Sequence, residues 1–394
     1  MRDHVAGAGA HVGARRPRVL IAGGGVAALE TLLALRELAA ERLELCVLAP
    51  AREFVYRPLS VLEPFAPGAG GGSVTPSLPL ADVVAEQDAT LLSGALAAVD
   101  ADAGMAVTRA GERIFYGDLV VAVGARAQRA VAGALTFGAP QDAAAIAEVV
   151  RGVRAGTLRR VAFAVPSGVA WTLPLYELAL RLGTERDPQG RAPELLLVTP
   201  EQAPLEAFGP EVSATARELL GEHGVALRTA STVEIFEEGL LWIELEGAAE
   251  VDALIALPRL RGPAIAGLPA DADGFVPVDG YGRVMGEEGV HAAGDATAQP
   301  LKQGGLAAQL ADVVAQDVVH RLLGGPRPSP FDPVLRTVLL TGGPSRFLRA
   351  HVARHGEERE DEQVADEPLW WPPAKIHAHH LAPYLAERLL REPA

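Results

Sequence analysis

Residues 18–28 read RVLIAGGGVAA, and this stretch decides the fold. Residues 18–22 form an apolar run of strand length, and leucines recur at helical spacing from Leu29 to Leu38. A second apolar run covers residues 43–48. A strand, a glycine loop, a helix and a second strand within about 30 residues form a parallel crossover unit. The pattern therefore predicts an α/β fold.

The glycine loop is the strongest local signal for a bound dinucleotide. Gly23 allows a tight turn, Gly25 lets a pyrophosphate approach the backbone, and the small Ala28 lets helix and strand pack closely. Val26 and Ala27 belong to the same loop, and the N-terminus of the helix that follows it offers free N–H groups and a dipole that favour phosphate. We therefore predict dinucleotide binding rather than a purely structural role for these glycines.

One expected feature of such a site is missing. An acidic residue normally ends the second strand and holds the ribose hydroxyls. Here Ala49 occupies that position. We expect backbone groups or another side chain to hold the ribose.

Two distant segments resemble motifs of the two-dinucleotide-domain flavoproteins. Residues 116–125 (YGDLVVAVGA) resemble their central D-x-L-V-V-A-x-G stretch, and residues 289–296 (GVHAAGDA) resemble their V-Y-A-A-G-D motif. In that superfamily the aspartate accepts hydrogen bonds from the ribityl chain of FAD, so the resemblance implies this role for Asp295. The order and spacing of the motifs match over nearly the whole chain. The residues assigned to FAD on these grounds are Gly23, Gly25, Val26, Ala27, Ala28, Ala49, Arg57, Leu96, Ala122, Gly124, Gly294, Asp295, Lys302, Gln303 and Gly304.

The run of residues 300–306 (PLKQGGL) follows at once. The superfamily begins a helix here, under the pyrimidine edge of the flavin. A helix N-terminus and a nearby cation stabilise the negative charge of reduced flavin. The chain has only two lysines, Lys302 and Lys375, and we predict that Lys302 tunes the flavin electrostatically; the alternative is a surface lysine.

Within the superfamily, two segments resemble the sulfide:quinone oxidoreductases and type II NADH dehydrogenases: residues 54–59 (FVYRPL) and residues 369–373 (LWWPP). Sulfide oxidation in that branch uses paired cysteines beside the flavin. This chain has only Cys46, which the pattern places in the second strand as a buried thiol. We therefore expect no redox disulfide, whereas a quinone acceptor stays open by analogy.

A second nucleotide loop in the middle of the chain is degenerate. Residues 166–171 read PSGVAW after a predicted strand, with one glycine and with Trp171 where a small residue is needed. Glu201, which follows the next predicted strand, is left as a candidate ribose ligand. Binding of NAD(P)H therefore stays open.

We predict two Rossmann-like domains of the three-layer ββα type, the first of them discontinuous, and a small C-terminal region. The FAD-binding domain comprises residues 16–130 and 258–325, and residues 131–257 form the second domain. Residues 1–15 are expected to be a disordered tail, and residues 326–394 form the C-terminal region.

Composition excludes several function classes. The net charge of −15 supplies no basic face for nucleic acid, and no apolar run is long enough to span a bilayer. We expect a cytoplasmic protein. The helical pattern around Leu381 and Leu385 leaves open contact with the inner face of the membrane, packing on the chain's own core, or a homo-oligomer. The spacing of the histidines at residues 377–380 fits no standard metal site.

Together these patterns predict an FAD-dependent oxidoreductase that passes two electrons through a non-covalently bound flavin between a small-molecule donor and acceptor. Two alternatives remain: an NAD(P)H-dependent flavoprotein reductase, and a non-catalytic flavin-binding scaffold, since a fold does not fix a function. The electron donor is not set by the sequence.

Overall fold

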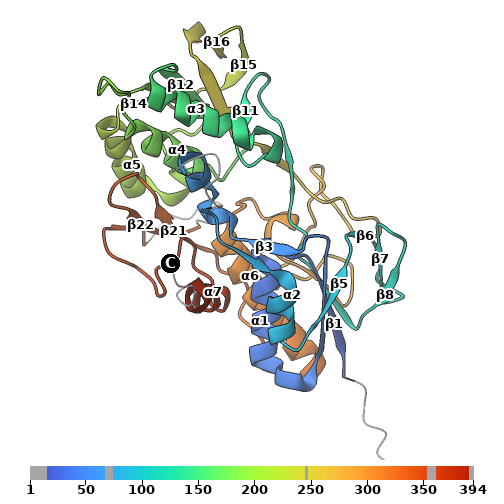
Figure 1. The fold of residues 1–394 in the computed structure, drawn as a ribbon. Coiled ribbons are helices and arrows are strands. Elements are labelled where there is room, and N and C mark those ends of the chain that lie inside the picture. The colour runs from blue at the N-terminus through green and yellow to red at the C-terminus, as the bar shows by residue number, and fades with distance from the viewer. Residues whose placement is uncertain (1–15, 67–73, 245–246, 353–360, 390–394) are drawn as a thin grey trace, which may run out of the picture.

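The computed structural model describes residues 16–66, 74–244, 247–352 and 361–389, and it confirms the predicted α/β class with two parallel sheets (Figure 1). The tail expected at residues 1–15 lies outside the described residues.

The first sheet is parallel throughout, in the order β20-β9-β1-β2-β5. It combines strands from the beginning of the chain with one from far along it. Its strands are β1 (Arg18–Ala22), β2 (Glu44–Ala49), β5 (Thr90–Ser93), β9 (Asp118–Val121) and β20 (Val290–Ala292).

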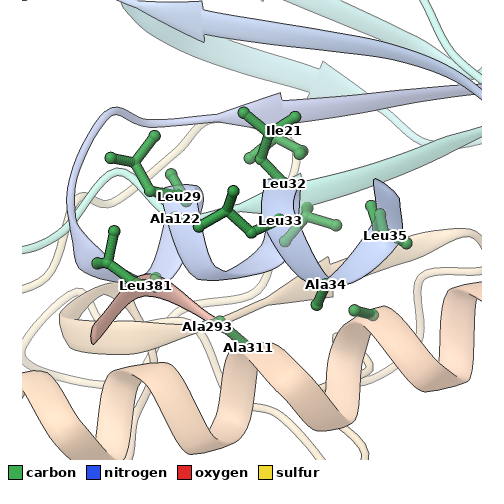
Figure 2. Close-up of a cluster of buried hydrophobic side chains, with 14 of the residues drawn as sticks. Ile21, Leu29, Leu32, Leu33, Ala34, Leu35, Ala122, Ala293, Ala311 and Leu381 are labelled. Carbon is green, nitrogen blue, oxygen red and sulfur yellow. The ribbon is translucent and has the colours of Figure 1, made fainter. Parts of the chain in front are cut away.

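Successive side chains of each strand point to opposite faces of this sheet, and both faces are buried. Val19 and Ile21 of β1 pack with helices α1 (Val26–Ala39) and α6 (Gly304–Leu323). Leu20 packs on the other side, in the cluster that also holds residues of β6 and β7. Figure 2 shows the leucines of α1 between the sheet and α6. The small antiparallel sheet on that other side consists of β6 (Leu96–Asp100), β7 (Met105–Thr108) and β8 (Arg113–Phe115). Helices, sheet and small sheet make the three layers.

The second parallel sheet has the order β11-β18-β12-β13-β14 and uses strands from residues 135–256 alone. Its strands are β11 (Leu135–Thr136), β12 (Arg160–Ala164), β13 (Glu194–Val198), β14 (Val225–Arg228) and β18 (Ala253–Ala256). The associated helices are α3 (Ala143–Ala155), α4 (Leu173–Gly183) and α5 (Pro210–Glu222), and an antiparallel sheet is formed by β15 (Val233–Glu237), β16 (Leu240–Ile243) and β17 (Gly247–Glu250).

The chain ends in an antiparallel sheet and a short helix, which lie beside both larger units in Figure 1. These elements are β21 (Val334–Leu339), β22 (Arg346–His351), β23 (Gln363–Ala365) and α7 (Leu381–Leu389). Further elements are β3 (Glu53–Val55), a nine-residue 3-10 helix (Arg57–Phe65), β4 (Ser77–Pro79), α2 (Leu80–Glu86), β10 (Arg126–Gln128) and β19 (Arg259–Arg261), together with four 3-10 turns of three residues each.

Helix α7 packs on the chain's own core. Leu381 and Leu385 are buried in the same cluster as the leucines of α1. The buried Glu30 of α1 accepts hydrogen bonds from the backbone N–H groups of His380 (2.8 Å) and Leu381 (2.6 Å). Glu30 also hydrogen-bonds Asp312 of α6, and burial together with the charge of Glu30 raises the pKa of Asp312 to about 9. The apolar side of α7 is thus used within the chain.

No helix in the described part of the chain has both the length and the apolar character that a bilayer crossing requires.

Candidate cofactor and substrate site

A cavity of about 920 Å³ lies at the carboxyl ends of the strands of the first sheet. Its walls include Ala49 at the end of β2, Ala122 after β9 and Ala293 after β20. Ligands of parallel α/β sheets bind at this edge, and ligand cavities usually measure about 300–1,000 Å³. The cavity therefore has the place and the size for a large cofactor.

The loop after β1 has a backbone conformation at Gly23 that requires glycine. Gly23 has φ +141°, and a Cβ atom there would lie 2.1 Å from the carbonyl oxygen of Ala122, so only glycine fits. A Cβ atom at Gly25 would meet nothing within 4 Å. The loop is therefore held tightly against the sheet on one side and is open to the cavity on the other, as close approach of a pyrophosphate requires.

Two helix N-termini meet at this cavity. Helix α1 begins after Gly25 with no side-chain cap and no acidic residue in its first turn. Helix α6 begins after Gln303, whose side-chain oxygen accepts a hydrogen bond from the N–H of Leu306 at 2.7 Å. Gly25, Gln303 and Gly304 all line the cavity. The partial positive charge of both helices favours an anionic ligand between them.

Asp295 lies in the turn after β20 and lines the same cavity. A Cβ atom at Gly294, where φ is +71°, would lie 3.0 Å from Cβ of Ala27, which places this turn against the start of α1. Burial raises the pKa of Asp295, while Lys302 and Arg57 act to lower it. The carboxylate is thus positioned beside the glycine loop, next to two cations.

All residues that the sequence assigns to the cofactor line this cavity except Ala28 and Lys302. Ala28 is fully buried among the apolar residues of α1 and α6, which agrees with the packing role that motivated its choice.

The ammonium group of Lys302 does not line the cavity, although the sequence analysis predicted that this residue lies beside the flavin. Its Nζ atom lies 3.7 Å from the ring centroid of Phe275 and donates a hydrogen bond to the carbonyl of Thr297. Burial lowers the pKa of Lys302 to about 8, although Asp295 and Asp271 oppose this shift. Its influence on a cofactor would therefore act through Asp295 rather than by contact, and its tuning role stays a prediction.

Lys375, the other lysine, does line the cavity and is almost fully buried. Its ammonium forms an ion pair with Glu177 of α4 and also hydrogen-bonds the carbonyl of Val338. Glu177 accepts a further hydrogen bond from the N–H of Leu340 at 2.8 Å through its Oε1 atom. Its Oε2 atom is buried with no hydrogen-bond partner.

Burial raises the pKa of Glu177 and lowers that of Lys375, while their mutual attraction opposes both shifts. The sequence analysis missed this pair because Lys375 and Glu177 are distant in sequence; the only signal was the rarity of lysine.

Glu201 is not free to hold a ribose. It is buried and accepts hydrogen bonds from the hydroxyl groups of Tyr176 (2.7 Å), Thr199 (2.8 Å) and Thr172 (3.0 Å). Both of its oxygens are occupied within the protein, since Oε2 accepts two of these bonds and Oε1 the third.

The donor set suits a flavin dinucleotide. A glycine loop at the N-terminus of α1 would hold the pyrophosphate, Asp295 would accept from the ribityl hydroxyls, and the N-terminus of α6 would face the pyrimidine edge.

Residues 17–313 match the family described as pyridine nucleotide-disulphide oxidoreductase. The chain belongs to this family. It is accordingly an FAD-dependent oxidoreductase. No curated protein matches the chain at a significant level.

Solved structures share the fold over most of the chain. The sulfide:quinone oxidoreductase of Aquifex aeolicus superposes with a TM-score of 0.77 at 20% identity, over 95% of this chain and 90% of that one. The covalent putidaredoxin reductase–putidaredoxin complex gives 0.63 at 19% identity, over 87% and 83%. An NAD-dependent persulfide reductase from A. fulgidus gives 0.61 at 16% identity, over 84% and 64%. At these identities the similarity establishes the architecture.

Proposed function

We propose that this flavoprotein passes two electrons between its FAD and a quinone, without a redox disulfide. The observation that carries the proposal is the buried Glu177–Lys375 pair, which lines the same cavity as Asp295 and the glycine loop. The fold shared with a sulfide:quinone oxidoreductase supports a quinone as the partner. The only cysteine of the sequence, Cys46, is buried in β2, so the chain has no second thiol with which it could form a disulfide.

Reduction of a quinone to a hydroquinone takes up two electrons and two protons. FAD supplies the electron pair together with one proton when it is in its reduced form. Glu177, whose pKa is raised by burial, would give the second proton through its unpartnered Oε2 atom. Lys375 would stabilise negative charge that develops on the quinone oxygen.

The test uses flavin that has been photoreduced under anaerobic conditions and then mixed with a short-chain benzoquinone in a stopped-flow instrument. We expect rapid recovery of oxidised-flavin absorption in the wild-type protein. Lys375→Met should slow this step by at least about tenfold, as removal of one electrostatic donor at a reacting centre commonly does. Lys302→Met is the comparison variant, because it removes the other lysine without touching the cavity wall, and it should slow the step less than Lys375→Met does.

Loss of one partner of a buried pair also threatens stability. The double variant Glu177→Gln with Lys375→Met therefore accompanies the single one, since it removes both charges together. Wild-type protein whose flavin is not reoxidised by any quinone would contradict the proposal, as would quinone turnover that is unchanged in both Lys375 variants.

The donor that reduces the flavin is tested separately by mixing the oxidised protein with NADH, NADPH, sulfide or a hydroquinone. An NAD(P)H-dependent reductase is the rival proposal, and the parallel second sheet supports it at the level of architecture. The occupied Glu201 carboxylate argues against it. Bleaching of the flavin by NADH or NADPH at micromolar concentration would favour the rival.

A further inference from the structure

The loop between β12 and α4 occupies the position of a second nucleotide loop. It follows the central strand of the second sheet, as residues 23–25 follow the central strand of the first. Trp171 stands at its end, is half-buried, and lines the cavity that also holds Gly25 and Asp295. A nucleotide loop needs a small residue at this point for close approach of a pyrophosphate, and an indole stands there instead.

Trp171 is held firmly in this position. Its ring packs on Phe208, with 5.8 Å between the centroids and 51° between the planes. The next residue, Thr172, is buried and donates its hydroxyl to Glu201. At the other end of the loop, Arg259 donates to the carbonyl of Ser167 at 3.1 Å. The carboxylate at the sequence position of a ribose ligand thus holds Thr172, the residue next to the tryptophan, instead.

The first turns of α4 continue the wall that Trp171 begins. Pro174 and Glu177 are three residues apart, lie on one side of the helix, and both line the cavity. The wall therefore runs from an aromatic ring to the unpartnered Oε2 atom of Glu177, which needs a hydrogen-bond partner. Phe137 and Leu173 add apolar surface to the same cavity.

We propose that Trp171 is a substrate-contacting residue, so that the former nucleotide loop forms the aromatic wall of the substrate chamber. The ligand class that fits is a planar ring carrying a carbonyl or hydroxyl oxygen, which stacks on or against the indole and directs its oxygen to Glu177. The proposal rests on the proposed function and extends it, since it places the quinone or its hydroquinone on the second domain's side of the cavity.

The test separates binding from electron transfer. Binding of a benzoquinone to the oxidised holoprotein is followed by the change in flavin absorption, and reoxidation of the photoreduced protein is followed in the stopped-flow instrument. Trp171→Leu should raise the dissociation constant about tenfold, whereas the limiting rate should change less than about threefold. Trp171→Phe, which keeps an aromatic ring, should restore most of the affinity. Trp242→Phe on β16, whose ring does not line the cavity, is the matched control.

A second readout does not depend on the leucine variant folding well. Quinone binding to wild-type protein should quench tryptophan fluorescence with the same dissociation constant, and the Trp171→Phe protein should lose that saturable quenching. An unchanged dissociation constant in Trp171→Leu, or retained quenching in Trp171→Phe, would overturn the role of Trp171. Failure of the wild-type flavin to react with bound quinone would instead overturn the proposed function.

Discussion

Replacing Asp312 by asparagine should make the protein less sensitive to alkaline pH. Asp312 lies between Glu30 and the start of α7, and its pKa is raised to about 9 by burial and by the charge of Glu30. An acid with a raised pKa in the folded state holds its proton more tightly there than in the unfolded chain. Its contribution to stability is therefore complete below the unfolded pKa of about 3.9 and declines as pH rises through about 9.

The size of the effect follows from the linkage relation. One group that is protonated only in the folded state lowers the free energy of unfolding by about 1.4 kcal/mol for each pH unit. From about pH 5 to about pH 8 this amounts to about 4 kcal/mol at most. An asparagine amide still donates to Glu30 but does not titrate, so Asp312→Asn should lose this slope and be the more stable protein at pH 8.

The assay is urea unfolding followed by circular dichroism at several pH values between about 5 and 9. Subtracting the free energy of unfolding of one protein from that of the other at each pH removes the pH dependence that all other titratable groups contribute equally to both. Glu37→Gln is the comparison variant: the side chain of Glu37 is 69% exposed, and its charge raises the pKa of Asp312 less than burial and Glu30 do, so its profile should stay much closer to the wild type than that of Asp312→Asn. Parallel profiles for Asp312→Asn and wild type would refute the idea that Asp312 keeps its proton in the folded protein.

Three further changes test the site. Gly23→Ala should abolish FAD retention, measured as the flavin-to-protein absorbance ratio, because the new Cβ atom would clash with the carbonyl of Ala122. Asp295→Asn should weaken FAD binding about tenfold or more in an equilibrium titration of apoprotein, since a charged acceptor facing hydroxyl donors contributes about 1.5–3 kcal/mol; undiminished affinity would remove Asp295 from the site. Cys46→Ala should leave the rate of flavin reoxidation unchanged and lower stability by about 1 kcal/mol, because the thiol is buried in β2; a lost reaction would reinstate thiol chemistry.

The first crossover unit could be predicted from sequence because its signals are local. The strand that starts at Arg18 is found where it is expected, and the helix and second strand around it differ by a few residues. Apolar periodicity and glycine conformation depend on neighbours in the chain, so they can be read without tertiary contacts. The helix that starts at Gly304 lies where the family resemblance implies it.

The polar chemistry of the cavity could not be predicted in this way. Lys302 and Lys375 carry the same charge, and only the fold decides which of them lines the cavity. Glu201 has the sequence position of a ribose ligand, but its hydroxyl partners come from α4 and from the end of β13. Long-range contacts of this kind leave no periodic trace in the sequence.

The arrangement of the two sheets also bears on how the chain is made. All strands of the second parallel sheet have been synthesised once the ribosome has passed residue 256. The first parallel sheet is incomplete until β20 has been made, and the helices that cover it are incomplete until α6 and α7 have been made. During translation, the part of the molecule made first is therefore finished last. The edge of β9 that β20 will cover has no strand partner until residue 292 has been made, and an open edge of this kind can pair with another chain.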